Sequence, residues 1–178
     1  MDLNNQNDMD KTEQIGKTTV CYIEHNEEFL MLYRNKKQND INEGKWIGVG
    51  GKIEPSENPN ECNMREVREE TGLILNSAQF LGIVKFRSDM YGNEDMYLYY
   101  SDDFEPEDEK DKEIFIREDK FLPPDCDEGV LKWIKRSDLM ALPMWEGDKS
   151  FLEPILKGAK EISMTIKYQG DNCTVINE

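Results

Sequence analysis

The chain has 178 residues, of which 37% are hydrophobic and 10% aromatic, and its formal net charge is −16. This length and composition fit one globular domain with a buried core and argue against a disordered acidic tail. The acidity argues against a protein that binds a nucleic acid polymer through the phosphate backbone, because such binding needs a basic surface. A small phosphorylated ligand remains compatible with it, since a divalent cation can supply positive charge locally.

The compartment is indicated by what the sequence lacks. The cysteines are scattered without a CxxC pair, which favours neither a zinc site nor a disulfide framework. No apolar run approaches the ~20 residues that a membrane helix needs, and the N-terminus lacks the apolar core of a signal peptide. We therefore expect a cytoplasmic protein with reduced thiols and no membrane partner.

The first third of the chain predicts strands after a polar start. Residues 1–15 are polar and aperiodic, which predicts a disordered leader ahead of one domain over residues 16–178. Two runs rich in β-branched, aromatic and aliphatic residues, 18–23 and 29–33, flank a polar turn and predict a β-hairpin. After a polar loop, residues 46–53 predict a short strand that glycines interrupt. Isolated glycines in a strand usually mark a bulge or a place where another group approaches the backbone closely.

Residues 58–71 have the signals of a helix. Asn58 can cap it, Pro59 suits its first position, and Glu61 completes a capping box. Gly72 ends it as a left-handed C-terminal glycine.

The second half of the chain predicts mostly strands. Residues 102–127 are rich in acid and proline and are predicted to form a surface insertion with a weak strand at 113–117. The other predicted elements are strands at 79–87, 95–101 and 129–135, a helix at 149–160, and a closing hairpin of 162–168 with 173–176. Strands outnumber helices in mixed order, which predicts an α+β sandwich.

Three glutamates share one face of the predicted helix. Glu66, Glu69 and Glu70 stand at i, i+3 and i+4, within about 100° of each other, whereas Met64 and Val67 are expected to pack on the sheet. Like charges at these spacings destabilise a helix, and a bound Mg²⁺ would reverse that effect because it prefers hard oxygen ligands. The alternative is a solvated acidic face.

The residues around this face complete a longer pattern. Residues 51–73 match G-x5-E-x7-R-E-U-x-E-E-x-G-U, where U is a bulky aliphatic residue, through Gly51, Glu57, Arg65, Glu66, Val67, Glu69, Glu70, Gly72 and Leu73. This is the Nudix box, and the chain resembles the Nudix hydrolase family. The resemblance implies the Nudix fold, an α/β/α sandwich with a mixed central sheet in which the box forms a loop–helix–loop.

The resemblance also implies roles for individual residues. Gly51, Glu57, Arg65 and Gly72 match structural positions of the box. The implied cofactor is Mg²⁺, with Mn²⁺ as a substitute, and the implied metal ligands are the carbonyl of Gly50 and the carboxylates of Glu66, Glu69, Glu70 and Glu128. The implied catalytic residues are Glu66, Glu69 and Glu128, and the sequence leaves open whether Glu69 or Glu128 takes the proton.

The reaction implied by the family is attack of water on a phosphorus of a nucleoside diphosphate derivative. A triphosphate would give the monophosphate and pyrophosphate. Lys52 and Arg34 are predicted phosphate contacts, although a lysine or arginine of this kind is more often simply solvated.

Beyond the box, the chain resembles the oxidised-purine nucleoside triphosphatases, the 8-oxo-dGTP diphosphatases of the MutT type that sanitise the nucleotide pool and so support DNA repair. The resemblance rests on residues 44–52, 144–151 and 167–171. It implies that Trp145 stacks on the base and that Asp148 reads the purine edge. The alternatives are a core tryptophan and a helix N-cap.

One position departs from the pattern of some relatives. Ile47 stands where those relatives place an asparagine that bonds the base, and an isoleucine can only wall the pocket. Base specificity therefore stays open, and canonical or differently modified purines are compatible with the sequence. Two alternative functions also stay open: a Nudix hydrolase of ADP-ribose or a capped nucleotide, and a catalytically silent nucleotide sensor. The sequence also leaves open a monomer or a homodimer.

Overall fold

The computed structural model describes residues 14–178. Of the predicted leader, residues 1–13 lie outside the described part, and Ile15 already begins the first strand. The strands are β1 (Ile15–His25), β2 (Glu28–Arg34), β3 (Trp46–Ile47), β4 (Val49–Lys52), β5 (Leu73–Ser88), β6 (Asn93–Pro106), β7 (Gly129–Lys135), β8 (Met164–Gln169) and β9 (Asn172–Asn177). The helices are α1 (Pro59–Thr71), α2 (Glu109–Glu118) and α3 (Asp148–Leu156), with a 3₁₀ turn at Arg136–Ala141.

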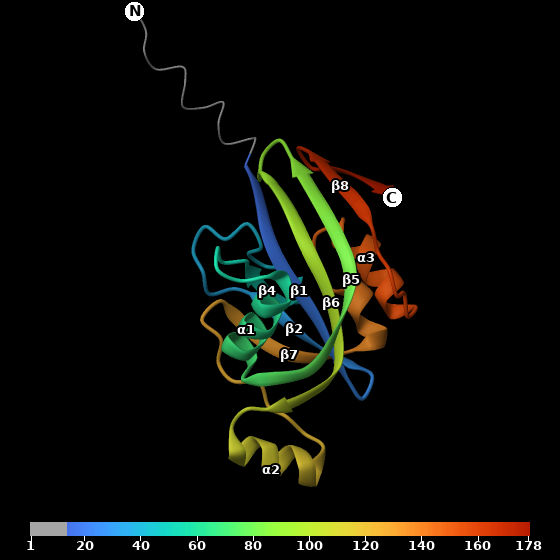
Figure 1. The fold of residues 1–178 in the computed structure, drawn as a ribbon. Coiled ribbons are helices and arrows are strands. Elements are labelled where there is room, and N and C mark those ends of the chain that lie inside the picture. The colour runs from blue at the N-terminus through green and yellow to red at the C-terminus, as the bar shows by residue number, and fades with distance from the viewer. Residues whose placement is uncertain (1–13) are drawn as a thin grey trace, which may run out of the picture.

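The strands form one mixed sheet of order β3-β2-β1-β6-β5-β8-β9, in which β4 also pairs with β1 and β7 with β2 (Figure 1). The pairs β1–β6 and β5–β8 are parallel, and the others are antiparallel. Strand β1 pairs with β4 through residues 18–21 in its middle and with β2 through its last three residues. The predicted α+β class is therefore confirmed.

The sheet is covered on both faces. Successive residues of β1 point alternately to the two sides, so Val20 and Tyr22 pack in one core cluster and Cys21 and Ile23 in the other. Helix α3 packs in the first cluster through Phe151, and α1 packs in the second (Figure 1). The layers are thus helix, sheet and helix, as the sequence predicted.

Several predicted elements are confirmed in detail. The β1–β2 hairpin turns at Asn26 and Glu27, both with positive φ, as a tight two-residue turn requires. The strand predicted over 46–53 is interrupted at Gly48 between β3 and β4. The predicted strand at 129–135 and the closing hairpin are present as β7 and as β8 with β9.

The segment from 102 to 127 differs from its prediction. Residues up to Pro106 extend β6, and the predicted strand at 113–117 is wrong, because these residues lie in α2. Asp108 caps this helix by accepting hydrogen bonds from the backbone of Lys110 and Asp111. A short apolar run does not distinguish a strand from a helix, and here the cap decides. The status of the segment as an insertion stays a prediction.

Helix α1 also corrects one detail. Val67 is fully buried as expected, but Met64 is 42% exposed, so its predicted packing on the sheet is wrong. Cys62 and Asn63 are buried in its place, and the carboxylate of Glu66 lies against Gly51 of β4.

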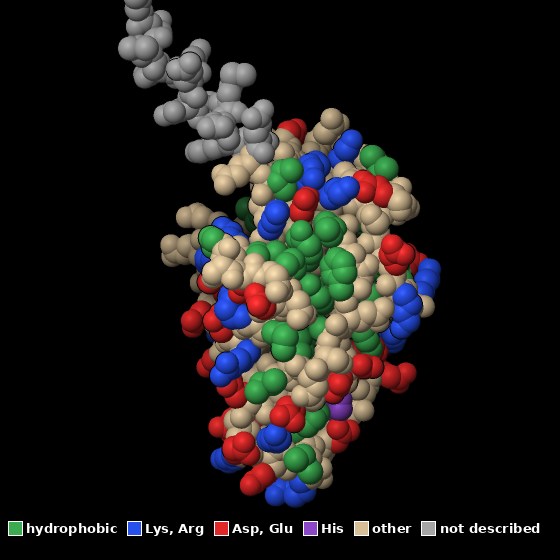
Figure 2. All heavy atoms as spheres, in the orientation of Figure 1, with side chains coloured by type: hydrophobic (Ala, Val, Ile, Leu, Met, Phe, Trp, Pro, Cys, Tyr) green, Lys and Arg blue, Asp and Glu red, His purple; other side chains and the backbone are tan. Residues whose placement is uncertain are grey.

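The surface view shows how the charge is distributed. Acidic side chains are spread over this face among basic ones, and hydrophobic side chains gather in its middle over the long strands (Figure 2). No helix in residues 14–178 is long and apolar enough to cross a membrane.

Candidate active site

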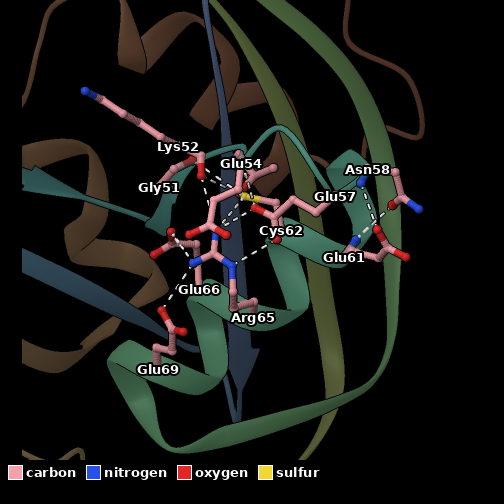
Figure 3. Close-up of polar contacts among 11 residues, drawn as sticks. Gly51, Lys52, Glu54, Glu57, Asn58, Glu61, Cys62, Arg65, Glu66 and Glu69 are labelled. Carbon is pink, nitrogen blue, oxygen red and sulfur yellow. Dashed lines mark hydrogen bonds and ion pairs between the residues drawn. The ribbon is translucent and has the colours of Figure 1, made fainter.

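The site is built on α1, whose start follows the prediction from sequence. The side chain of Asn58 accepts a hydrogen bond from the Glu61 backbone at 2.9 Å, and the Glu61 carboxylate accepts one from the Asn58 backbone at 2.8 Å (Figure 3). Gly72 ends the helix with φ of 70°. These caps satisfy backbone groups at both ends and fix where the helix begins and ends.

Arg65 joins the preceding loop to the helix. Its Nε and Nη2 donate to the two oxygens of Glu57 at 2.9 and 2.6 Å, and Nη2 also donates to the Lys52 carbonyl at 3.2 Å. Its Nη1 donates to Glu66 at 2.8 Å and to Glu69 at 3.2 Å (Figure 3). The hydrogen bonds from Arg65 lower the pKa of Glu57 to about 2, so this brace stays charged at neutral pH.

Two glycines let β4 approach its neighbours. A Cβ at Gly51 would lie 2.4 Å from the carboxylate of Glu66, and a Cβ at Gly50 would lie 1.9 Å from the Thr19 carbonyl oxygen. Any larger residue at 51 would displace the Glu66 side chain. The first glycine of the box is therefore required by the position of a carboxylate, not by an unusual backbone conformation.

Three carboxylates converge in what we call the carboxylate end: Glu66, Glu70 and Glu128. Burial raises the pKa of Glu70, and the charges of Glu128 and Glu66 raise it further. Burial also raises the pKa of Glu66, although Arg65 opposes this. Within residues 14–178 the Oε2 atom of Glu70 is buried and accepts no hydrogen bond. Such an oxygen is costly to bury unless a cation or donor reaches it.

The donor set of the carboxylate end fits a divalent cation. It consists of hard carboxylate oxygens, one of them orphaned and buried, which is the chemistry that Mg²⁺ prefers. In the described part of the chain, however, no three acidic, histidine or cysteine side chains form a shell ready to hold a metal. The arginines bonded to Glu66 and Glu128 would have to share them with the ion.

Arg34 braces the carboxylate end from β2. It is buried, its Nε donates to Asp40 at 2.6 Å, and its Nη1 donates to Glu128. Asp40 thereby ties the loop between β2 and β3 to the site. The predicted phosphate contacts of Arg34 and Lys52 remain predictions. Lys52 lines the cavity, and its side chain points away from Arg65 (Figure 3).

A cavity of about 630 Å³ runs from the carboxylate end to a cluster of aromatic residues. This part of the cavity, the aromatic end, consists of the rings of Tyr91, Trp145 and Tyr168 and of three polar residues that also line the cavity: Asn42, Glu94 and Asp148. The cavity brings together most of the residues that the sequence singled out: Arg34, Ile47, Gly50, Gly51, Lys52, Glu66, Glu70, Glu128, Trp145 and Asp148.

Glu69 is the exception among the predicted ligands. Its side chain is 61% exposed and bonded to Arg65, and it does not line the cavity. Its prediction as a ligand or base stays open. Glu57, Arg65 and Gly72 also lie outside the cavity, as residues that support the loop and helix would.

Trp145 is half-buried at the aromatic end. Its Nε1 donates to Asn42 at 2.8 Å, and the rings of Tyr91 and Tyr168 meet it edge-on at 5.3 and 5.5 Å between centroids. The Nζ atom of Lys45 lies 4.3 Å from its ring centroid. A base that stacks on Trp145 would use the opposite face or displace Lys45.

Asp148 lies deep in the same part of the cavity. It is only 9% exposed, and within the described residues its carboxylate accepts no hydrogen bond. Burial raises its pKa to about 7, and the charge of Glu94 adds to this effect while Lys45 opposes it. The alternative that Asp148 caps α3 is wrong, because the helix begins at Asp148 with Gly147 in the cap position.

Sequence reasoning did not find several residues of the aromatic end. Asn42, Tyr91, Glu94 and Tyr168 come from three separate parts of the chain, and no local pattern links them to Trp145. Only Tyr168 lay in a stretch that the resemblance had marked. Ile47, expected to wall the pocket, does line the cavity.

The chain was compared with known proteins. The family model for the NUDIX domain matches residues 16–154, most of the chain. The chain is 26% identical over 158 residues to an uncharacterized Nudix hydrolase, YvcI, of Bacillus subtilis, covering 86% of this chain and 87% of that protein. It is 25% identical to the oxidized purine nucleoside triphosphate hydrolase of Danio rerio, over 78% of this chain and 80% of that one.

Among solved structures, a MutT protein from Bacillus halodurans superposes with a TM-score of 0.72 at 22% identity, covering 90% of this chain and 97% of that one. The site and the family match together show that this chain belongs to the Nudix hydrolase family. It has the Nudix fold and is a pyrophosphohydrolase that acts on a nucleoside phosphate. Nudix enzymes generally use divalent metal ions and small nucleotide derivatives.

Proposed function

We propose that this chain hydrolyses oxidised purine nucleoside triphosphates such as 8-oxo-dGTP, with Mg²⁺, to the monophosphate and pyrophosphate. The observation that carries the proposal is the single cavity that joins the carboxylate end to the aromatic end. A nucleotide that spans it would place its phosphates near Glu66 and Glu70 and its base beside Trp145 and Asp148. In this role the enzyme would remove damaged nucleotides before a polymerase uses them.

In this proposal the residues have distinct tasks. Glu66, Glu69, Glu70, Glu128 and the carbonyl of Gly50 would hold Mg²⁺, for which Mn²⁺ can substitute. Bound metal offsets negative charge on the phosphates and acidifies water. Arg65 and Arg34 hold Glu66 and Glu128 in place, and either Glu69 or Glu128 takes a proton as water attacks phosphorus and the P–O bond to pyrophosphate breaks.

The base would be held by different forces. Trp145 offers a flat ring for stacking, and Asp148 offers a largely buried carboxyl group that lines the cavity. Ile47 walls the cavity without donating a hydrogen bond. The similarity to the Danio rerio hydrolase supports a purine triphosphate as the substrate.

A panel assay tests the proposal. With Mg²⁺, the expected result is a kcat/KM for 8-oxo-dGTP well above that for dGTP, and loss of turnover when EDTA removes the metal. Equal values for the two would overturn the oxidised-purine assignment. Stronger activity on ADP-ribose or a capped nucleotide would assign that compound as the substrate. No turnover on any of these compounds would indicate a catalytically silent sensor.

A further inference from the structure

A second acidic side chain enters the aromatic end from the sheet. Glu94 and Met96 both line the cavity, as alternate residues of β6 must when they share one face. The intervening Asp95 points to the other face, where its carboxylate accepts a hydrogen bond from Arg87 at 2.8 Å. Glu94 therefore differs from its neighbour in facing the cavity.

The Glu94 side chain is held but not neutralised. Its Oε1 accepts a hydrogen bond from the Thr18 hydroxyl at 2.8 Å, which fixes its rotamer from β1. Within residues 14–178 neither Glu94 nor Asp148 belongs to an ion pair. A half-buried carboxylate anchored by one neutral donor retains the capacity to accept further hydrogen bonds.

Asp148 gives an independent reason to expect a ligand here. Its carboxylate is more than nine-tenths buried, lines the cavity, and accepts no hydrogen bond in the described chain. Glu94 lines the same cavity, and its negative charge adds to the effect of burial in raising the pKa of Asp148. Two acids in one cavity, of which one has a single neutral donor and the other has none among the described residues, are stabilised when a ligand supplies donors to both.

We propose that Glu94 is a specificity-determining residue that, together with Asp148, reads a purine edge carrying adjacent N–H donors. Guanine-type bases carry such an edge at N1 and the 2-amino group, whereas adenine places an acceptor at N1. A carboxylate facing that acceptor would stay unpaired, so adenine would bind more weakly. This inference rests on the proposed function for its assignment of the aromatic end to the base.

Recognition of the N1 and 2-amino edge by Glu94 differs from recognition of the oxygen at position 8. Position 8 lies on the opposite edge of the purine from N1 and the 2-amino group. The contribution of Glu94 is therefore the same for guanine and 8-oxoguanine. Discrimination between these two bases depends on other residues.

The test is equilibrium binding of dGMP, 8-oxo-dGMP and dAMP, because monophosphates carry the base without the reacting bond. The wild type is expected to bind both guanine nucleotides at least about tenfold more tightly than dAMP. Glu94→Gln, which keeps the size of the side chain, is expected to weaken both guanine nucleotides about tenfold and to leave dAMP nearly unchanged. Thr18→Val should act in the same direction with a smaller effect.

The control is Asp95→Asn, which removes one carboxylate on the same strand outside the cavity and should keep the wild-type ratios. Equal wild-type affinities for dGMP and dAMP, or an unchanged ratio in Glu94→Gln, would overturn the inference. Hydrolysis is measured separately. A protein that shows the expected binding but hydrolyses no triphosphate would refute the proposed function and retain the role of Glu94.

Discussion

At the carboxylate end of the cavity two of the three glutamates come from one helix, and arginines hold two of the three in place. At the aromatic end Glu94 and Asp148 come from separate elements, and among residues 14–178 neither of them forms an ion pair. The first arrangement holds carboxylates in position where we propose that Mg²⁺ binds. The second leaves carboxylate oxygens that face the cavity and can accept hydrogen bonds from a ligand. One cavity thus combines a braced charged region with an unpaired polar one, and the two should respond differently to mutation.

The largest effect should come from the helix that carries the box. Glu69→Gln is expected to lower kcat at least a hundredfold, because it removes a negative charge from the proposed metal region while keeping the shape of the side chain. Steady-state kinetics with Mg²⁺ measures it, and circular dichroism checks the fold. The control is Arg68→Gln on the same helix, which removes only the exposed ion pair between Arg68 and Glu107. Near-normal turnover in Glu69→Gln would contradict the metal assignment.

Asp148 should make the stability of the protein depend on pH, because its carboxyl group is buried. Its pKa is raised to about 7 in the folded protein, so folding favours the protonated form, and stability is lost as pH rises through this value. Asp148→Asn removes the effect. Between pH 5 and 8.5 the free energy of unfolding of the variant should rise relative to wild type by about 2 to 3 kcal/mol.

Urea unfolding of both proteins at the two pH values measures this difference. Asp95→Asn, which removes a carboxylate of the same sheet that does not line the cavity, serves as the matched control and should show a nearly constant difference from wild type. A pH-independent difference for Asp148→Asn would mean that its carboxyl group is not protonated in the folded state near neutral pH.

Trp145 should affect binding more than turnover. Trp145→Ala removes the stacking surface, and the expected result is a KM for the purine triphosphate raised roughly tenfold, with kcat within about threefold of wild type. Trp133→Phe, on the other face of the sheet, should leave KM unchanged. A fall in kcat with an unchanged KM would place Trp145 at the reacting phosphates instead of the base.

The smallest effect concerns the start of α1. Asn58→Ala removes the capping bond to Glu61 and should lower the free energy of unfolding by about 1 kcal/mol. Asp108→Ala removes the corresponding cap of α2, a helix with no buried residues, and should cost less because that helix can fray locally. Equal losses in denaturant unfolding would indicate that α2 is as strongly coupled to the core as α1.

The sequence by itself determined the elements with strong local signals. The capping box, Pro59 and Gly72 predicted α1 almost to the residue, and the spacing of Glu66, Glu69 and Glu70 predicted the acidic face. These features depend on contacts within a few residues, which is why a linear pattern carries them. The family resemblance and the fold class followed from the same stretch and are confirmed.

Only the tertiary structure decided what lies across from that helix. It showed that Gly51 makes room for the Glu66 carboxylate, that Arg34 holds Glu128, and that Glu94 enters the cavity beside Asp148. It also showed that residues 113–117, which the sequence predicted as a strand, lie in α2. The contacts around the cavity depend on residues far apart in the chain, whereas α2 depends on the local cap at Asp108. The burial that raises the pKa of Asp148 exists only once the sheet and α3 have packed together.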